Sequence, residues 1–423
     1  MKWLTSVIKN KTIKNIVSLS LVQGLNYILP LITLPYLVRT LGVHSYGVLT
    51  FCVAFNQYFL LFTQFGFNFS ATQRIAKARQ EKEQISKIFF SVLGAKLFFC
   101  FVSFVVLCIL IILVPYFYNI KVILLFSFVA IVGDVLFPGW FFQGEEKMSN
   151  IAISNILARL STVPLIFLFV NSTDDVARAA LFMGSANVLA GIIAMIAVVK
   201  SGRVSLYKPS IKDIKEEIIC SWHFFISSAA MSLYTVTTPV LLGAISGPYV
   251  LGVFSAADKL RQALQGLLNP VSQALYPKIS RMIKEQDRTT VFQFIRKLLT
   301  VQAVFGLVVS LICCLGASVI IPLVYNKSGT PDVIAVFEIL AWIPFVVSIS
   351  NVLGIQTLLT TGYKREFSQV IITGGVVNIV LLCLLAFHFE AFGAALSILI
   401  TEAIITIGMS RMIMKLKIPL FNR

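Results

Sequence analysis

Long apolar runs are the feature that most limits what this chain folds into. An apolar run of about 17–25 residues is long enough to cross a bilayer as a helix. Because 58% of the residues are hydrophobic and only 13% are charged, a water-soluble enzyme is excluded. The predicted fold class is an all-α integral membrane protein with twelve spans, at 16–38, 46–69, 88–114, 122–143, 151–170, 179–199, 222–245, 249–275, 298–324, 333–359, 369–387 and 391–414.

Basic residues fall mainly on one side of these spans. With the N-terminus placed inside, 27 Lys and Arg lie in inner segments, four lie in outer segments and four lie within spans. This distribution follows the positive-inside rule and predicts that both termini are cytoplasmic. The net charge of +17 is therefore a topology signal, and no basic stretch is large enough to favour nucleic-acid binding. The longest predicted outer loop is Asn171–Arg178, so no folded outer domain is expected.

An internal repeat is indicated by matching segments separated by 205 residues. Gly47-Val48-Leu49-Thr50 opens the second span, and Gly252-Val253-Phe254-Ser255 opens the eighth. We therefore predict two six-helix bundles, at 1–203 and 204–423, which share one orientation.

Polar residues repeat at the same offset. Their spacings place them on one helix face in each half. Such stripes line a water-filled cavity, or they are interhelical hydrogen-bond contacts. We favour the cavity. The two stripes are Thr50, Gln57, Gln64 and Asn68 in the first half, and Ser255, Gln262, Asn269 and Gln273 in the second.

Charged residues within spans are costly and mark functional sites by default. Asp258 and Arg261 are three residues apart, so a local ion pair is plausible. Lys96 and Arg159 have no opposite charge within a helical turn on their own spans, and Lys259 points about 100° away from its neighbour Asp258. Such cations in a wet cavity suit an anionic substrate. Asp134 and Glu402 either pair with these cations or bind a coupling H⁺ or Na⁺. The predicted substrate-binding residues are Arg39, Lys96, Arg159, Lys259, Arg261, Gln57 and Gln262, and the ion-coupling candidates are Asp134, Asp258 and Glu402.

Motifs for catalysis and for cofactors are missing from the sequence. It contains no phosphate-binding G-x-x-x-x-G-K-[ST] loop, no H-E-x-x-H and no G-x-S-x-G. The three histidines are dispersed, and no predicted outer loop contains any of the seven cysteines. We expect no catalytic residue, no metal site, no disulfide and no cofactor beyond a coupling ion.

Four segments, in order along the chain, together form a signature. The first is Tyr36-Leu37-Val38-Arg39-Thr40-Leu41-Gly42, followed by Tyr46-Gly47. The others are residues 66–76, Trp140-Phe141-Phe142-Gln143-Gly144-Glu145-Glu146-Lys147-Met148, and Gly393-Ala394-Ala395 with Thr401-Glu402. This set resembles the polysaccharide flippases of the Wzx type, within the multidrug/oligosaccharidyl-lipid/polysaccharide superfamily, and its first segment is similar to the family's first loop.

The resemblance implies a function. Such proteins move undecaprenyl-pyrophosphate-linked O-antigen units across the bacterial inner membrane during lipopolysaccharide synthesis. It also implies a V-shaped, MATE-like fold and ion-coupled alternating access. The implied partners are the lipid-linked oligosaccharide, membrane lipids, the O-antigen polymerase and the chain-length regulator.

Other functions stay open. An O-antigen polymerase or ligase is an enzyme that is expected to carry a large outer loop, which this chain lacks. A multidrug or cation antiporter of the same superfamily is expected to favour acidic sites. A lipid II or teichoic-acid flippase differs only in its substrate.

Overall fold

The computed structural model describes residues 11–78, 81–266, 275, 279–283, 287–326 and 331–421, and its side chains from residue 32 onward apart from 227, 230–235 and 288. The described residues form helices and no strands. The chain divides into two compact units. Unit 1 is Met1–Leu41 with Val48–Ser232, and unit 2 is Gly42–Gly47 with Leu233–Arg423.

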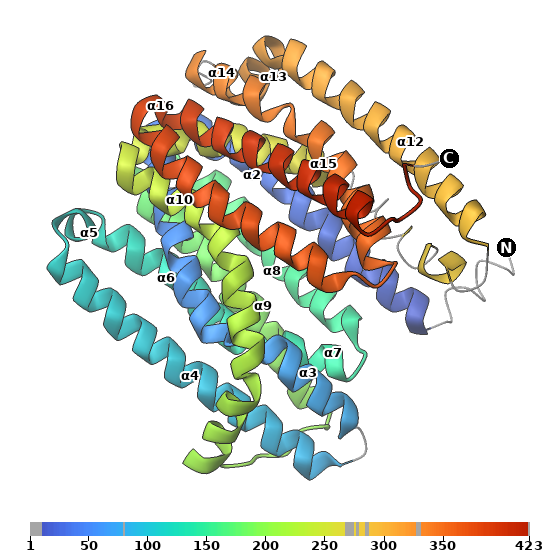
Figure 1. Ribbon diagram of the computed structural model, residues 1–423. Coiled ribbons are helices and arrows are strands. Elements are labelled where there is room, and N and C mark those ends of the chain that lie inside the picture. The colour runs from blue at the N-terminus through green and yellow to red at the C-terminus, as the bar shows by residue number, and fades with distance from the viewer. Residues whose placement is uncertain are drawn as a thin grey trace, which may run out of the picture. The chain divides into compact units, whose positions relative to one another are not determined.

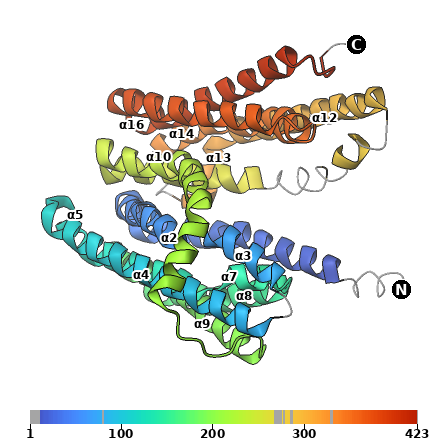
Figure 2. The same cartoon turned by 60° about the horizontal axis from the view of Figure 1, so that its bottom comes forward.

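Unit 1 contains eight of the described α-helices and one short 3₁₀ helix (Figure 1). Within it α9 packs along α6 and α8 (Figure 2). Its elements are α2 (Lys11–Gln64, apart from the Gly42–Gly47 segment), α3 (Phe67–Lys77), α4 (Lys82–Leu113), α5 (Pro115–Asn119), α6 (Lys121–Leu136), α7 (Gly139–Gly144), α8 (Met148–Phe169), η1 (Thr173–Asp175), α9 (Val176–Lys200) and the first part of α10.

Unit 2 contains the rest of α10 and the C-terminal helices. A core of buried aliphatic side chains, including Ile295, Val352 and Ile405, joins α12, η3 and α16. The elements are α10 (Ile211–Gly266), α12 (Arg288–Leu315), α13 (Ala317–Tyr325), α14 (Pro331–Leu340), α15 (Ile343–Asn351), the π-helix η3 (Val352–Leu359) and α16 (Lys364–Lys415).

The helix breaks agree with the predicted span boundaries. Nine helices of the described residues are long and apolar enough to cross a membrane. Three of the longest carry one non-helical residue each: Gly42 in α2, Gly247 in α10 and Glu390 in α16. Each break lies between two predicted spans, and in α16 the side chain of Asn378 donates to Thr401, so the two arms pack together. The total of twelve spans stays a prediction.

The boundary between the halves also stays a prediction, although the contacts in the structure differ from it. We predicted a division after residue 203, whereas residues 204–232 belong to unit 1. The physical reason is local. Asp213 pairs with Lys87 of α4, and Glu217 pairs with Arg74 of α3, which ties the start of α10 to unit 1.

The repeat is visible in one backbone crossing within unit 2. Gly42 and Gly247 both have a positive φ, of 73° and 85°, and they are 205 residues apart. A Cβ on Gly47 would lie 1.8 Å from the carbonyl oxygen of Pro248, and a Cβ on Gly252 would lie 2.0 Å from that of Val43. Val43 and Pro248 are again 205 residues apart. Two equivalent turns therefore contact each other reciprocally, and each needs glycine at the contact.

Replacing Gly252 or Gly47 by alanine should destabilise the protein strongly. A methyl group at either position meets a backbone oxygen that cannot rotate away, and overpacking of this kind costs about 1–3 kcal/mol or more. The thermal stability of the detergent-purified variants measures the effect. Gly94→Ala is the matched control, because its Cβ would meet only side-chain atoms, the nearest being the flexible Ile214 Cδ1 at 3.1 Å. Equal melting temperatures for Gly252→Ala and Gly94→Ala would contradict the proposed close crossing.

Candidate functional site

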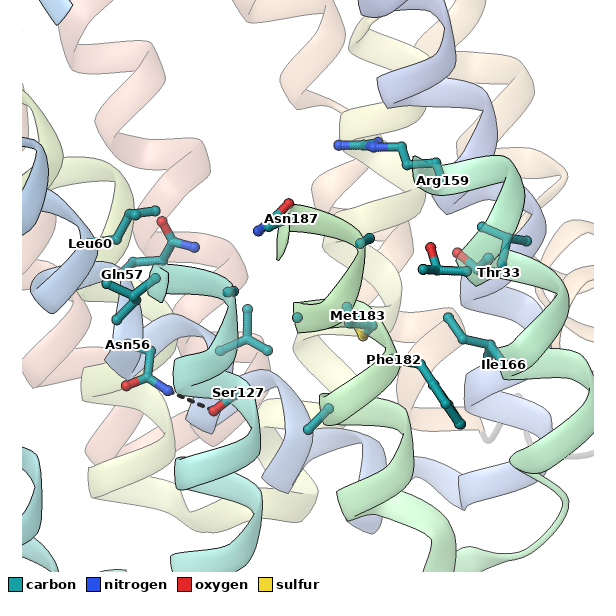
Figure 3. A pocket seen from close by; sticks show the side chains of 18 residues that line it. Thr33, Asn56, Gln57, Leu60, Ser127, Arg159, Ile166, Phe182, Met183 and Asn187 are labelled. Atoms are coloured by element: carbon teal, nitrogen blue, oxygen red, sulfur yellow. Dashed lines mark hydrogen bonds between the residues drawn. The ribbon is translucent and has the colours of Figure 1, made fainter. Parts of the chain in front are cut away.

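A cavity of about 300 Å³ lies inside unit 1, between α2, α6, α8 and α9 (Figure 3). Its volume is at the lower end of the range for small-molecule sites, so it accommodates one chemical group and not a large ligand. Much of its lining is apolar, including Leu60, Ile166 and Met183. Its polar lining residues are Thr33, Asn56, Gln57, Ser127, Arg159, Thr162 and Asn187.

Two features of the helix packing build this cavity. Asn56 is buried, and its Nδ2 donates to the carbonyl of Leu124 at 3.1 Å and to Ser127 Oγ at 2.6 Å, which fixes α2 against α6. Gly133 lets α6 approach α9 closely, since a Cβ there would lie 2.4 Å from the backbone carbon of Asn187. Small residues allow such close approach between membrane helices. The walls of the cavity are therefore fixed by packing.

Arg159 is the charged residue that lines this cavity. It is half-buried, and the structure gives it neither a carboxylate nor a hydrogen-bond partner among the described residues. Figure 3 shows its side chain extending from α8 over the cavity, with the amide of Asn187 below it on α9. A guanidinium held in an apolar surrounding without a counter-charge favours an anion, and its planar fork suits phosphate or carboxylate oxygens.

Lys96 lies in a different environment, because it is fully paired. Its side chain is buried, with 2% of the residue exposed. Its Nζ is 3.0 Å from the Asp134 carboxylate and also donates to the Asp134 carbonyl at 2.6 Å. Gln64 Nε2 donates to the other carboxylate oxygen of Asp134 at 3.0 Å. The structure thus favours pairing for Asp134, one of the two alternatives that the sequence left open.

A second charged cluster lies on α10. Asp258 pairs with Arg261 at 2.7 Å, which confirms the predicted local ion pair. Gln262 Nε2 donates to the other Asp258 oxygen at 2.6 Å, and Lys259 Nζ donates weakly to Gln262 Oε1 at 3.4 Å. Arg261 also donates to Gln265. Arg261 is therefore charge-compensated by Asp258, whereas Lys259 is exposed.

The remaining predicted site residues lie at several places along the fold. Arg39 is exposed on α2 just before the break at Gly42, and Glu402 is half-buried on the second arm of α16. Gln57 lines the unit 1 cavity, and Ser255 is buried in unit 2. Asn269 and Gln273 lie outside the described residues. The role of each predicted site residue stays a prediction.

One prediction about the first polar stripe is wrong. Asn68 does not share a helix face with Thr50, Gln57 and Gln64, because α2 ends at Gln64 and the chain turns at Phe65 and Gly66, with φ values of 41° and 75°. The Phe65 ring stacks between other rings, 4.5 Å from that of Phe99 and 4.4 Å from that of Phe225. This aromatic packing holds the turn, and the hydropathy pattern gives no sign of it.

Sequence reasoning also missed five of the polar residues that line the cavity: Thr33, Asn56, Ser127, Thr162 and Asn187. Asn187 lies in the predicted span 179–199 and Thr33 in the span 16–38. Asn187 was detectable as an isolated amide in an otherwise apolar run, a position that is rarely filled without a hydrogen-bonding reason.

The fold and the cavity define a class of protein: a multi-pass, all-α membrane protein of a transporter fold. Solved structures agree. The chain matches an inward closed conformation of the lipid II flippase MurJ, with a TM-score of 0.73 and 15% identity, covering 95% of this chain and 87% of that one. It also matches an inward-facing multidrug resistance MATE family transporter of the MOP superfamily, with a TM-score of 0.69, 13% identity and coverages of 95% and 98%. The predicted MATE-like fold class is confirmed.

The sequence comparisons define the family. A family model described as polysaccharide biosynthesis protein matches residues 12–283. A protein of Escherichia coli (strain K12) named "Putative O-antigen transporter" is 41% identical over 394 residues, which cover 93% of this chain and 94% of that protein. The chain belongs to this polysaccharide biosynthesis protein family, as its resemblance to the polysaccharide flippases predicted.

Proposed function

We propose that this protein is a flippase that moves undecaprenyl-pyrophosphate-linked O-antigen units from the inner to the outer leaflet of the bacterial inner membrane. The observation that carries the proposal is the 41% identity, over nearly the whole chain, to a relative named as an O-antigen transporter. That name describes transport and no catalysis, which supports the expectation that the chain is not an enzyme.

The cavity in unit 1 supports an anionic substrate. The pyrophosphate that joins lipid and sugar carries several negative charges, and acidic sugars carry more. Arg159 offers an uncompensated guanidinium in the same cavity as the neutral amides of Gln57 and Asn187. Amides hydrogen-bond a polar glycan without trapping it by charge. We therefore propose that this cavity binds the phosphate groups or one acidic sugar of the substrate, while the rest of the O-unit lies elsewhere.

Ion coupling and protein partners belong to the same proposal. Alternating access coupled to H⁺ or Na⁺ requires a carboxylate that changes its bonding during transport, and Asp134, Asp258 and Glu402 are the proposed candidates. The O-antigen polymerase and the chain-length regulator are proposed partners, because they act on the same units once these reach the outer leaflet.

Deleting the gene should abolish surface O-antigen and leave lipid-linked O-units in the inner leaflet. An enzyme that polymerises or ligates the units would instead leave single units exposed on the outer leaflet. Lectin labelling of intact spheroplasts separates these outcomes, because it detects only outward-facing sugars. A plasmid copy of the gene is the control and should restore the display. Outward-facing single units in the deletion strain would contradict the flippase proposal.

The proposed orientation has both termini in the cytoplasm. Alkaline phosphatase fusions at Lys121, Asn171 and Lys327 should be active, because the enzyme folds only outside the cytoplasm. Alkaline phosphatase fusions at Arg203 and Lys284 should be inactive. Green fluorescent protein fused at the same two positions should fluoresce instead. The reason is the 27-to-4 distribution of basic residues. An active phosphatase fusion at Arg203 would contradict the proposed orientation.

A further inference from the structure

Residues 201–221 comprise the connection from α9 to α10 and the first turns of α10, and we call them the strap. The strap is bound firmly to the other helices of unit 1. Arg203 donates from Nε and Nη2 to the two carboxylate oxygens of Glu145, at 3.0 and 3.1 Å, between α7 and α8. Lys147 contacts the same carboxylate at 3.3 Å. Burial acts to raise the pKa of Glu145, but the bonds from Arg203 and Lys147 outweigh it and hold that pKa below its usual value.

The middle of the strap is fixed at Asp213. Lys87 of α4 approaches this carboxylate to 2.7 Å. Ser210 Oγ caps the start of α10 by accepting from the Asp213 N–H at 3.2 Å, and Ser210 donates to the carboxylate from its backbone N–H, at 2.9 Å, and from Oγ, at 2.7 Å. The Tyr207 hydroxyl donates to the same oxygen at 3.0 Å. The bond from Lys87, helped by those from Ser210, holds the pKa of Asp213 far below its usual value. The carboxylate is therefore a permanent anchor at neutral pH.

The end of the strap is bound along one helix face. Glu217 is buried and lies 2.5 Å from Arg74 of α3, and Ser221 Oγ lies 2.5 Å from Ser70 Oγ. Asp213, Glu217 and Ser221 are four residues apart, so they share the face of α10 that packs on unit 1. In Figure 1 the strap lies at the end of unit 1 where α3 ends and α4 begins.

The outer face of the strap is apolar and basic, and nothing in the described part of unit 1 covers it. Leu206 is 94% exposed and Ile211 is 86% exposed. Along α10 this exposed face continues through Ile219 to Trp222. Between these apolar residues lie three exposed lysines that form no ion pair with any described residue: Lys208, Lys212 and Lys215.

This combination matches the chemistry of a membrane surface. Large apolar side chains in water are unfavourable, by about 25 cal/mol for each Å² of apolar surface. The strap begins at the end of the candidate membrane span Thr173–Lys200 and leads into the predicted span 222–245 of α10, so we place it at the level where these two spans end. Trp is enriched at that level, and lysines near it attract anionic headgroups. Binding to a soluble protein partner would not require this face to lie at the level of the membrane surface, whereas binding to lipid does.

We propose that the strap docks on the anionic lipid surface. Leu206 and Ile211 insert between the headgroups, and Lys208, Lys212 and Lys215 bind the phosphates of anionic phospholipids. Because the opposite face of the strap holds α3, α4 and the α7–α8 turn, the bound lipid fixes this end of unit 1 at the membrane surface. Under the proposed orientation the surface is that of the inner leaflet, but the docking itself does not depend on the orientation or on the transported substrate.

The first test locates Leu206 relative to the lipid. The full-length L206C variant, in a background with the exposed Cys220 and Cys383 changed to serine, is labelled with an environment-sensitive fluorophore and reconstituted into phosphatidylcholine–phosphatidylglycerol nanodiscs. The protein without L206C gives the labelling background. Nitroxide lipids labelled near the headgroup should quench the probe, and aqueous iodide should not. Quenching by iodide alone would show that Leu206 is in water, available to a protein partner, and would overturn the proposal.

The second test measures lipid binding directly. Native mass spectrometry of the purified full chain counts bound phosphatidylglycerol, and we expect the K208Q/K212Q/K215Q variant to bind it about tenfold more weakly. A control variant, K208R/K212R/K215R, keeps the three charges at the same positions and should bind as the parent does. Equal binding by the strap variant and the parent would overturn the proposal. Neither test measures transport, so a failure here leaves the flippase proposal untouched.

Discussion

Replacing Arg159 by glutamine is expected to lower O-antigen display by about tenfold to a hundredfold while the protein level stays normal. A charge-assisted hydrogen bond contributes about 1.5–3 kcal/mol, and every 1.4 kcal/mol is about a factor of ten. Arg159 has no described partner that would be left unpaired, so its loss should cost little stability. Lysine at the same position should restore part of the activity, because it keeps the charge and loses the fork.

The control for this prediction is Arg178→Gln. Arg178 is an exposed residue of the same unit, its pair with Asp175 at 2.6 Å lies at the start of α9, and neither residue lines the cavity. Lipopolysaccharide gels at low expression level, where transport limits display, should therefore show normal O-antigen for R178Q. If R159Q also gives normal display at that expression level, the cavity does not bind the substrate.

The sequence predicted the all-α membrane fold, because long apolar runs must be buried in lipid or protein, and the breaks at Gly42, Gly247 and Glu390 fall between its predicted spans. It also predicted the local pair of Asp258 and Arg261, since residues three apart on a helix lie on the same side. It failed at Phe65 and Gly66, where apolar residues continue through a backbone turn that stacking on Phe99 and Phe225 holds in place. Hydropathy does not detect a turn between two apolar segments.

The sequence also could not decide which intramembrane cation is compensated. Lys96 and Arg159 look alike in sequence, because neither has an acid within a turn of its own helix. Lys96 gains its partner from α6, 38 residues further along the chain, and Arg159 gains none among the described residues. Only the packing of α4 against α6 separates a structural lysine from an arginine that is free to bind a ligand.

Breaking the Lys96–Asp134 ion pair should strongly lower the stability of the protein. Removing one partner of a buried ion pair costs about 3–5 kcal/mol, because the other charge is left in a poorly solvated site. Asp134→Asn should be the more harmful change, since Lys96 is the more deeply buried partner, with 3% of its side chain exposed against 23% for Asp134. The double variant K96M/D134L should recover most of the loss. Thermal unfolding followed by size-exclusion chromatography in detergent measures the stability of D134N, K96M and K96M/D134L. K200M, at an exposed lysine, is the control.

The double variant also decides whether the pair takes part in transport. Gln64 ends α2 just before the turn at Phe65, and Asp134 lies just before the end of α6. Neutralising the Asp134 carboxylate would weaken the bonds that it accepts from Gln64 and Lys96 at these two helix ends, one turn from cavity residues Leu60 and Ala130, while Lys96 would keep its bond to the Asp134 carbonyl. A coupling role therefore predicts that K96M/D134L is stable but no longer responds to the membrane H⁺ gradient. If K96M/D134L is stable and displays O-antigen normally, the pair is structural and the coupling ion binds elsewhere.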